Sequence, residues 1–287
     1  MIAGILGAGA WGTALAIIAE KAGNDVILWS YDGSYAEFDG VNMPIKIKIT
    51  KEIKKLSAAD VWLVSTPAAH FRKTLQKSHD FYRGKPVIIC TKGMEPASDK
   101  IMSEILAEEL PECLDFGVLS GPQFAKEVAQ GLPTGSTLAG TAAAVDIGKH
   151  ILNKLYLEIS DDIIGTEICG IGKNAIALIS GYSSIKASGE NEKALIFTRA
   201  WNEVVNLGLA SGAKIDSFLG LCGIGDLFLS ATSKTSRNYS AGVAIATNTE
   251  ITGTIEGIQA LNSLINRAAD KNISMPVLIE MKSKMKI

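Results

Sequence analysis

The hydrophobic pattern of the chain changes a little past its middle. In the first part, short uncharged runs of strand length alternate with segments of helical period. This pattern predicts buried strands over 2–6, 25–29, 59–65, 86–90 and 115–119, a weaker alternating strand over 45–49, and helices over 13–22 and 68–77. Strands that alternate with helices are typical of a parallel sheet covered by helices on its faces.

A second pattern begins after residues 157–165, because nearly every later segment has helical period. The helices that it predicts run over 167–186, 190–210, 237–246, 255–270 and 277–286. A chain of 287 residues is long for one domain, so we expect a boundary near Gly165. The expected fold class is α/β, with a mostly parallel sheet domain over 1–164 and an all-α domain over 165–287.

A glycine-rich turn follows the first predicted strand. Gly7, Gly9 and Gly12 form the pattern G-x-G-x-x-G before the first helix, and the strand over 25–29 completes a βαβ unit. The first glycine permits the tight turn, the second lets the backbone approach a pyrophosphate, and the third lets the helix pack closely on the strand. The phosphates then rest on the helix N-terminus. This order favours a Rossmann-type dinucleotide site over an ordinary glycine-rich junction.

The residues after the second predicted strand bear on the choice of dinucleotide. They are Ser30, Tyr31 and Asp32, and they stand where the adenosine ribose is normally held. An acidic side chain there favours the free 2′-hydroxyl of NAD, whereas an arginine favours the 2′-phosphate of NADP. The nearest basic residue downstream is Lys46, so the local sequence favours NAD slightly over NADP.

Two further strand ends carry candidate binding residues. Lys92 follows the strand over 86–90, and Gly121 and Gln123 follow the strand over 115–119. In open parallel sheets, ligands gather outside the carboxyl ends of the strands. Position alone therefore makes these residues candidates, although an ordinary solvated loop lysine has the same pattern.

The first predicted helix of the second domain contains an unexpected lysine. Residues 168–181 are almost all apolar or small, and Lys173 and Asn174 are the exceptions. Helices that are buried on most sides rarely carry a lysine. Burial disfavours the charged ammonium and suits a lysine to proton transfer. The alternative is a lysine whose stem carries the ammonium to the surface.

A glycine-rich stretch over 219–225 precedes Asp226, and it neither follows a strand nor opens a helix in the predicted pattern. We expect it to form a tight backbone passage that presents this carboxylate. Further on, Ser236 stands as a helix N-cap, with Arg237 and Asn238 in the first turn. Arginine at a helix start is unfavourable unless an anion lies there. The pattern therefore indicates a phosphate clamp, with an ordinary N-cap beside a surface arginine as the alternative.

Composition narrows the kinds of partner. Lys and Arg total 28 against 30 Asp and Glu, which gives no electrostatic reason to expect nucleic acid or an anionic membrane surface. Residues 1–19 carry no charge, but their glycines and the absence of a basic start favour a buried strand and helix over a signal peptide or membrane span. The 4 cysteines and 3 histidines are scattered, so we expect no metal site and a reducing, cytoplasmic location.

Several of these motifs together carry a resemblance to one family. They lie at 7–15, 91–93, 120–125 with Glu127, 172–174, 223–227, 236–238 and 254–257. In these motifs, and in their order along most of the chain, the sequence resembles the bacterial NAD(P)-dependent glycerol-3-phosphate dehydrogenases. The resemblance implies reversible hydride transfer between NAD(P)H and dihydroxyacetone phosphate, giving sn-glycerol 3-phosphate for glycerophospholipid synthesis. It also implies a homodimer.

The resemblance further implies a role for individual residues. Lys173 is implied as the catalytic acid/base, with Asp226 orienting it or a substrate hydroxyl. The residues implied to contact the triose phosphate are Lys92, Gly121, Gln123, Lys173, Asp226, Ser236, Arg237 and Asn238. Those implied on the cofactor side are Gly7, Gly9, Ala10, Trp11, Gly12, Tyr31, Lys92, Ala125, Arg237, Thr254 and Glu256.

The sequence also departs from the family's usual pattern. The family usually has Ser or Thr at the position of Gln123 and often a basic residue at that of Tyr31, and it is usually longer between the second strand and Pro44. Two alternatives therefore stay open: a β-hydroxyacid dehydrogenase of similar architecture, and a non-catalytic nucleotide-binding sensor. The Arg237 helix start favours a phosphate substrate over a simple carboxylate.

Overall fold

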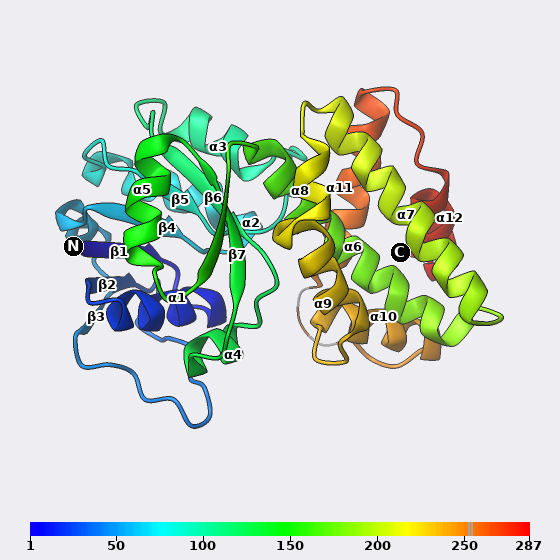
Figure 1. Cartoon of the computed structure of the whole chain (residues 1–287), viewed down its shortest axis with the longest axis horizontal. Helices are drawn as coiled ribbons and strands as arrows, with labels where there is room; N and C mark the ends of the chain where they lie inside the picture. Colours follow the sequence, from blue (N-terminus) through cyan, green and yellow to red (C-terminus); the bar gives the residue numbers. More distant parts are fainter. Residues whose placement is uncertain (252, 254) are drawn as a thin grey trace. The chain divides into compact units, whose positions relative to one another are not determined.

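The computed structural model describes residues 1–251, 253 and 255–287, and the chain divides into two units (Figure 1). Unit 1 comprises Met1–Glu95 and Lys100–Ile163, and unit 2 comprises Pro96–Asp99 and Ile164–Ile287. The four residues Pro96–Asp99 therefore belong to unit 2, although the residues on both sides of them belong to unit 1.

Unit 1 is built on one eight-stranded sheet, with the strand order β3-β2-β1-β4-β5-β6-β7-β8 (Figure 1). Neighbouring strands are parallel except for the antiparallel pair β6 and β7. The strands are β1 (Ile2–Leu6), β2 (Asp25–Trp29), β3 (Ile47–Thr50), β4 (Val61–Val64), β5 (Val87–Ile89), β6 (Phe116–Ser120), β7 (Gly135–Gly140) and β8 (Tyr156–Ser160). The sheet confirms the mostly parallel α/β fold expected from the first half of the sequence.

Side chains alternate between the two faces of this sheet, and helices bury both faces. On β4, Val61 and Leu63 belong to the core on one face, whereas Trp62 and Val64 belong to the core on the other. The first face is covered by α1 (Ala10–Lys21), α4 (Ala125–Gln130) and α5 (Ala142–Ile151). The second face is covered by α2 (Ala68–Ser78), α3 (Met102–Glu109) and the short helix η1 (Ile53–Ala58), and another short helix, η2 (His79–Phe81), follows α2. Burial on both faces explains why the five strands β1, β4, β5, β6 and β7 lack charged residues.

The sequence pattern does not predict β7, β8, α3, α4 or α5. β7 is the small-residue run Gly-Ser-Thr-Leu-Ala-Gly, which has no strand-like hydrophobic signal. Its glycine is needed at the pairing with β6, because a Cβ at Gly140 would lie 2.6 Å from the Cα of Gly117. α4 has only 6 residues, too few for a helical period to be recognised.

Unit 2 is helical. Its helices are α6 (Ile163–Lys186), which begins at the unit boundary, α7 (Glu190–Ala210), α8 (Ile215–Leu219), α9 (Asp226–Thr232), α10 (Arg237–Thr247), α11 (Glu256–Asp270) and α12 (Pro276–Met285), with a π-helical turn η3 (Leu221–Gly225) before α9. The all-α second domain is therefore confirmed. One expectation was wrong: the glycine-rich stretch before Asp226 is itself helical and opens α9, because its glycines allow the wide π turn to pack against Phe218.

The backbones of α6 and α10 touch where both helices carry glycine. A Cβ at Gly181 would lie 1.9 Å from the carbonyl oxygen of Tyr239, and a Cβ at Gly242 would lie 2.0 Å from that of Leu178. This close approach holds the start of α10 against the helix that carries Lys173.

Two helical stretches in the described part of the chain are long and apolar enough, by length and composition, to cross a membrane. They are Ile163–Lys186 and Ile215–Thr232, and 78% of the apolar window of the first is buried inside the protein. A core helix passes the same test, so this finding is weak evidence for a membrane span.

Candidate active site

The glycine turn in unit 1 has the geometry of a dinucleotide cradle. Gly7 has a φ of +108°, which a side chain would strain. A Cβ at Gly12 would lie 1.8 Å from the carbonyl oxygen of Gly7, so only glycine fits there. A Cβ at Gly9 would meet nothing within 4 Å, and Gly9 caps α1 without a side-chain hydrogen bond. An open space at a helix N-terminus is suited to a pyrophosphate.

The side chains next to this turn also fit a dinucleotide. Ala10 and Trp11 are the first residues of α1, and the buried Nε1 of Trp11 has no hydrogen-bond acceptor among the described residues. At the end of β2, Tyr31 is 76% exposed. Hydrogen bonds from the Ser34 hydroxyl, and then from its backbone N–H, hold the pKa of Asp32 at about 2, so this carboxyl is ionised. The glycine turn, the Nε1 of Trp11 that has no acceptor among the described residues and the exposed Tyr31 ring together fit the expected cofactor site.

Lys92 and Gly121 lie together in unit 1. The ammonium of Lys92 donates to the carbonyl oxygen of Gly121 at 3.0 Å. A Cβ at Gly121 would lie 2.7 Å from the Cα of Ser136, so the loop after β6 packs tightly on β7. The amide nitrogen of Gln123 donates to the Ser136 hydroxyl, and its buried Oε1 has no partner in the part of the chain that is described. Ala125 follows as the first residue of α4.

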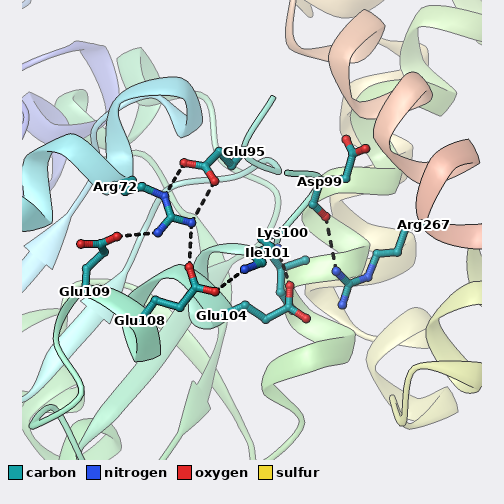
Figure 2. A network of polar contacts seen from close by, with 9 residues as sticks. All are labelled: Arg72, Glu95, Asp99, Lys100, Ile101, Glu104, Glu108, Glu109 and Arg267. Atoms are coloured by element: carbon teal, nitrogen blue, oxygen red, sulfur yellow. Dashed lines mark hydrogen bonds and ion pairs between the residues drawn. The ribbon is translucent and has the colours of Figure 1, made fainter. Parts of the chain in front are cut away.

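A network of charged side chains holds the segment that follows Lys92 (Figure 2). Met94 and Ile101 pair as a β-bridge, and the N–H of Glu95 donates to the carbonyl of Lys100 at 2.9 Å. The guanidinium of Arg72 on α2 binds both oxygens of Glu95, at 2.7 and 2.9 Å. It also pairs with two carboxylates of α3, Glu108 at 2.8 Å and Glu109 at 2.5 Å. These hydrogen bonds, led by that to Glu95, raise the pKa of Arg72.

The sequence does not reveal this network, because single charges on amphipathic helices look like solvated surface. Only the fold brings α2, α3 and the segment after Lys92 together. The loop that presents Lys92 is therefore anchored by side chains far from it in sequence.

In unit 2, Lys173 lies in a cluster of buried polar groups. Its ammonium is 3.3 Å from the Asp226 carboxylate, and the two side chains are 14% and 1% exposed. The ammonium also donates to the Ser230 hydroxyl at 3.0 Å, and that hydroxyl donates to Asp226 at 3.3 Å. Sequence reasoning missed Ser230, although its spacing of one helical turn from Asp226 on α9 was a usable signal.

A second polar cluster in unit 2 joins α6, α10 and α11. The amide of Asn238 donates to the Oδ1 of Asn174 at 2.8 Å, and its own Oδ1 accepts the N–H of Gly257 at 2.9 Å. Asn174 donates to Glu256 at 3.4 Å. The guanidinium of Arg237, 81% exposed, lies 3.8 Å from the other oxygen of Glu256. Exposure leaves this guanidinium accessible to a ligand.

The start of α10 has the geometry expected of it. Ser236 is the N-cap, and its hydroxyl accepts the N–H of Tyr239. Arg237 and Asn238 form the first turn. Thr254, implied on the cofactor side, lies outside the described residues. Within those residues, no group of three or more His, Cys, Asp and Glu side chains has an arrangement that could hold a metal.

The glycine cradle on a parallel sheet and the buried lysine–carboxylate cluster in a helical unit define a nicotinamide-dependent oxidoreductase. Family models agree: the model described as NAD-dependent glycerol-3-phosphate dehydrogenase N-terminus matches residues 2–146, and that described as its C-terminus matches residues 162–284. The chain belongs to the NAD-dependent glycerol-3-phosphate dehydrogenase family, which confirms the resemblance drawn from its motifs.

Relatives and solved structures agree with this assignment. The glycerol-3-phosphate dehydrogenase [NAD(P)+] of Maricaulis maris is 36% identical over an alignment of 298 positions, which covers 96% of this chain and 89% of that protein. That of Parvibaculum lavamentivorans is also 36% identical, over 95% of this chain and 88% of the relative. The glycerol-3-phosphate dehydrogenase structure from Coxiella burnetii superposes with a TM-score of 0.89 at 28% identity, covering 99% of this chain and 94% of the other.

Structures of hydroxyacid dehydrogenases share the fold. A D-mandelate dehydrogenase superposes with a TM-score of 0.65 at 14% identity, over 100% of this chain and 97% of that one. Similarity at this level shows the fold alone, so it does not support the β-hydroxyacid alternative.

Proposed function

We propose that this protein reduces dihydroxyacetone phosphate reversibly to sn-glycerol 3-phosphate, using NADH or NADPH. The observation that carries the proposal is the cluster of Lys173, Asp226 and Ser230, in which a largely buried ammonium lies against a carboxylate and a hydroxyl. Reduction of a ketone needs a hydride donor and a proton donor. The family assignment supports the first, and the cluster supports the second.

Lys173 is the proton donor of this proposal. As the substrate carbonyl is reduced, negative charge develops on its oxygen, and an ammonium stabilises that charge and then transfers a proton. In the reverse direction, the neutral amine accepts the proton from the alcohol. Asp226 and Ser230 orient Lys173 through the contacts described above, and the carboxylate favours its charged form. When bound, the nicotinamide supplies or accepts the hydride.

Arg237 and the start of α10 bind the phosphate of the substrate. The helix N-terminus offers unpaired N–H groups and a positive dipole, and the exposed guanidinium adds a charged fork. Asn238, fixed by Asn174 and the N–H of Gly257, keeps that helix start in place. Three residues assigned to the substrate, Lys92, Gly121 and Gln123, lie in loops of unit 1. The remaining assigned substrate residues are Ser236, Lys173 and Asp226.

The cofactor is held mainly by unit 1, through the cradle of Gly7, Gly9 and Gly12. Preorganised backbone at this turn binds the pyrophosphate, and the orphan Nε1 of Trp11 is available as a donor. The other residues assigned to the cofactor are Ala10, Tyr31, Lys92, Ala125, Arg237, Thr254 and Glu256. Residues 1–164 thus serve as the dinucleotide-binding domain, and residues 165–287 as the substrate-binding and catalytic domain.

The composition and the resemblance to the family support the proposed cellular setting. The product supplies glycerophospholipid synthesis, and the enzyme acts in the cytoplasm as a homodimer on a small phosphorylated substrate, without nucleic acid, membrane or metal as a partner.

Absorbance of the reduced nicotinamide tests the proposed reaction. Purified protein should oxidise NADH or NADPH with dihydroxyacetone phosphate and leave 3-oxo acids unreduced. Turnover of 3-oxo acids alone would indicate a β-hydroxyacid dehydrogenase. Binding of the nucleotide without turnover of either substrate would indicate a sensor.

A further inference from the structure

Two lysines from distant parts of the sequence lie beside the turn that follows β2. The ammonium of Lys77, in the last turn of α2, lies over the Tyr31 ring at 4.6 Å from its centroid. The stem of Lys51, just after β3, crosses Gly33 so closely that a Cβ there would lie 2.5 Å from its Cε and 3.5 Å from its Nζ. Two cations thus flank residues 31–33.

The backbone beside this turn is fixed by the sheet. The N–H of Ser30 donates to the carbonyl of Thr50 at 2.9 Å, and the indole of Trp29 donates to the carbonyl of Lys51 at 3.1 Å. These bonds extend the pairing of β2 with β3 past the strand ends. Lys51 is therefore held next to the turn by the fold and does not meet it by chance.

Neither ammonium is neutralised by the protein. Within the described residues, Lys51 and Lys77 form no ion pair with a carboxylate, whereas the neighbouring Lys54 and Lys55 both pair with Glu52, at 3.3 and 2.8 Å. A lysine over an aromatic ring keeps its full charge and remains able to bind an anion. Lys51 and Lys77 therefore bring two positive charges to the end of β2 without an ion pair of their own among the described residues.

The acidic residue of the turn is engaged by the turn itself. The Oδ1 of Asp32 accepts the Ser30 hydroxyl at 3.1 Å and the N–H and hydroxyl of Ser34 at 2.9 and 2.6 Å. Asp32 thus shapes the loop through one of its two carboxylate oxygens. The two lysines outnumber this single carboxylate beside the turn.

We propose that Lys51 and Lys77 form a subsite for the 2′-phosphate of NADP(H), which makes them the residues that decide whether this enzyme accepts the phosphorylated cofactor. The residues after β2 are where a Rossmann-type domain meets the adenosine ribose, and a lysine ammonium is a well-suited partner for a phosphate monoester. The inference rests on the proposed dinucleotide site at Gly7 to Gly12. It points to NADP where the local sequence slightly favours NAD, because the basic groups come from other strands and helices.

Binding of adenosine nucleotides tests the subsite without turnover. Calorimetry on the full chain should show that 2′,5′-ADP binds more tightly than 5′-AMP, and that added salt reduces this difference. Lys51→Met and Lys77→Met keep most of the stem and remove the charge. Each variant should bind 2′,5′-ADP about tenfold more weakly than the wild type, as loss of a charge-assisted hydrogen bond predicts. The affinity for 5′-AMP should stay within about twofold of the wild-type value. Lys54→Met, which removes the same charge nearby, should change neither.

The same measurements with NADPH and NADH should give the same ratios. The double variant Lys51→Met/Lys77→Met should bind both cofactors with similar affinity. Equal affinity of the wild type for 2′,5′-ADP and 5′-AMP would overturn the proposed subsite. An equal loss of affinity for both ligands in the variants would also overturn it. Failure of the wild type to bind 5′-AMP would instead overturn the dinucleotide site on which the inference rests.

Discussion

At the scale of single residues, Lys173 shows how its position suits an ordinary side chain to the proposed role of proton donor. It projects from a stretch of α6, residues 168–181, that is apolar or small except for Lys173 and Asn174, and burial alone would make its charge costly. The Asp226 carboxylate at 3.3 Å and the Ser230 hydroxyl at 3.0 Å offset that cost and fix the direction of the ammonium. A charged donor held in a fixed direction is what a reaction that creates an alkoxide requires.

Lys173→Ala should nearly abolish turnover and leave the cofactor bound. General acid catalysis contributes roughly 10²- to 10⁴-fold, so we expect kcat to fall by at least about 10²-fold, because no other proton donor of this cluster is cationic. Steady-state rates with dihydroxyacetone phosphate and NADH fluorescence titration measure the two effects. Lys186→Ala, at the exposed end of the same helix, is the matched control. Near-normal turnover by Lys173→Ala would show that Lys173 is not the proton donor.

Arg237→Ala should raise the KM for dihydroxyacetone phosphate by about tenfold to a hundredfold. The reason is loss of a charged hydrogen bond to the phosphate, which acts on binding in the ground state and the transition state alike, so kcat changes less. The exposed guanidinium supports little of the fold, and thermal stability should stay the same. If only the affinity for the cofactor changed, the assignment of Arg237 to the phosphate would be wrong.

At the scale of elements, the turn before α1 contains one glycine that the fold requires, Gly12, and one that leaves space for a ligand, Gly9. A Cβ at Gly12 collides with the Gly7 carbonyl at 1.8 Å, whereas a Cβ at Gly9 meets no protein atom within 4 Å. Gly9→Ala should therefore keep the melting temperature and lose nucleotide affinity, because its methyl group occupies the space of the pyrophosphate. Gly12→Ala should lower both. Thermal unfolding and NADH fluorescence titration check the pair, and unchanged NADH binding by Gly9→Ala would contradict the cradle.

Elements with a strong local signal were predictable from the sequence. Three elements have the predicted bounds: the strands Ile2–Leu6 and Asp25–Trp29 and the helix Glu190–Ala210. Their burial pattern follows from the hydrophobic pattern of their own residues. The Ser236 cap was predictable for the same reason. β7 was not, since it depends on its partner β6 and has no hydrophobic run of its own.

The parts of the site that escaped prediction depend on contacts between distant segments. Arg72 meets Glu95 and the carboxylates of α3 only after the sheet has formed. In the same way, Lys51 and Lys77 reach the turn after β2 from other elements, so a search of neighbouring positions finds only Lys46. A motif locates the residues that contact the ligand through the backbone, whereas remote side chains that tune the site appear only in the fold.

At the scale of the whole molecule, stability depends on a buried carboxylate that holds the C-terminal helix. Glu203 on α7 is 7% exposed, and its two oxygens accept the N–H groups of Val277 and Leu278 at 2.8 and 3.0 Å. It thereby caps α12, whose N-cap residue makes no side-chain hydrogen bond. Burial raises the pKa of Glu203 above its usual 4.5, and these two hydrogen bonds oppose the rise without cancelling it.

The direction of this shift predicts how stability depends on pH. Below pH 4.5, Glu203 is protonated in both the folded and the unfolded chain, and it contributes no pH dependence. As the pH rises, the unfolded chain ionises first, so the folded state binds more protons and its stability falls until the pH passes the folded pKa. Glu203→Gln keeps one acceptor and cannot ionise. The free energy of unfolding of the wild type, measured in urea relative to this variant, should therefore decrease with pH above 4.5 at no more than about 1.4 kcal/mol per pH unit and then level off. A relative stability that rises with pH, or that does not change, would show that the carboxylate is at least as well stabilised inside the protein as in water.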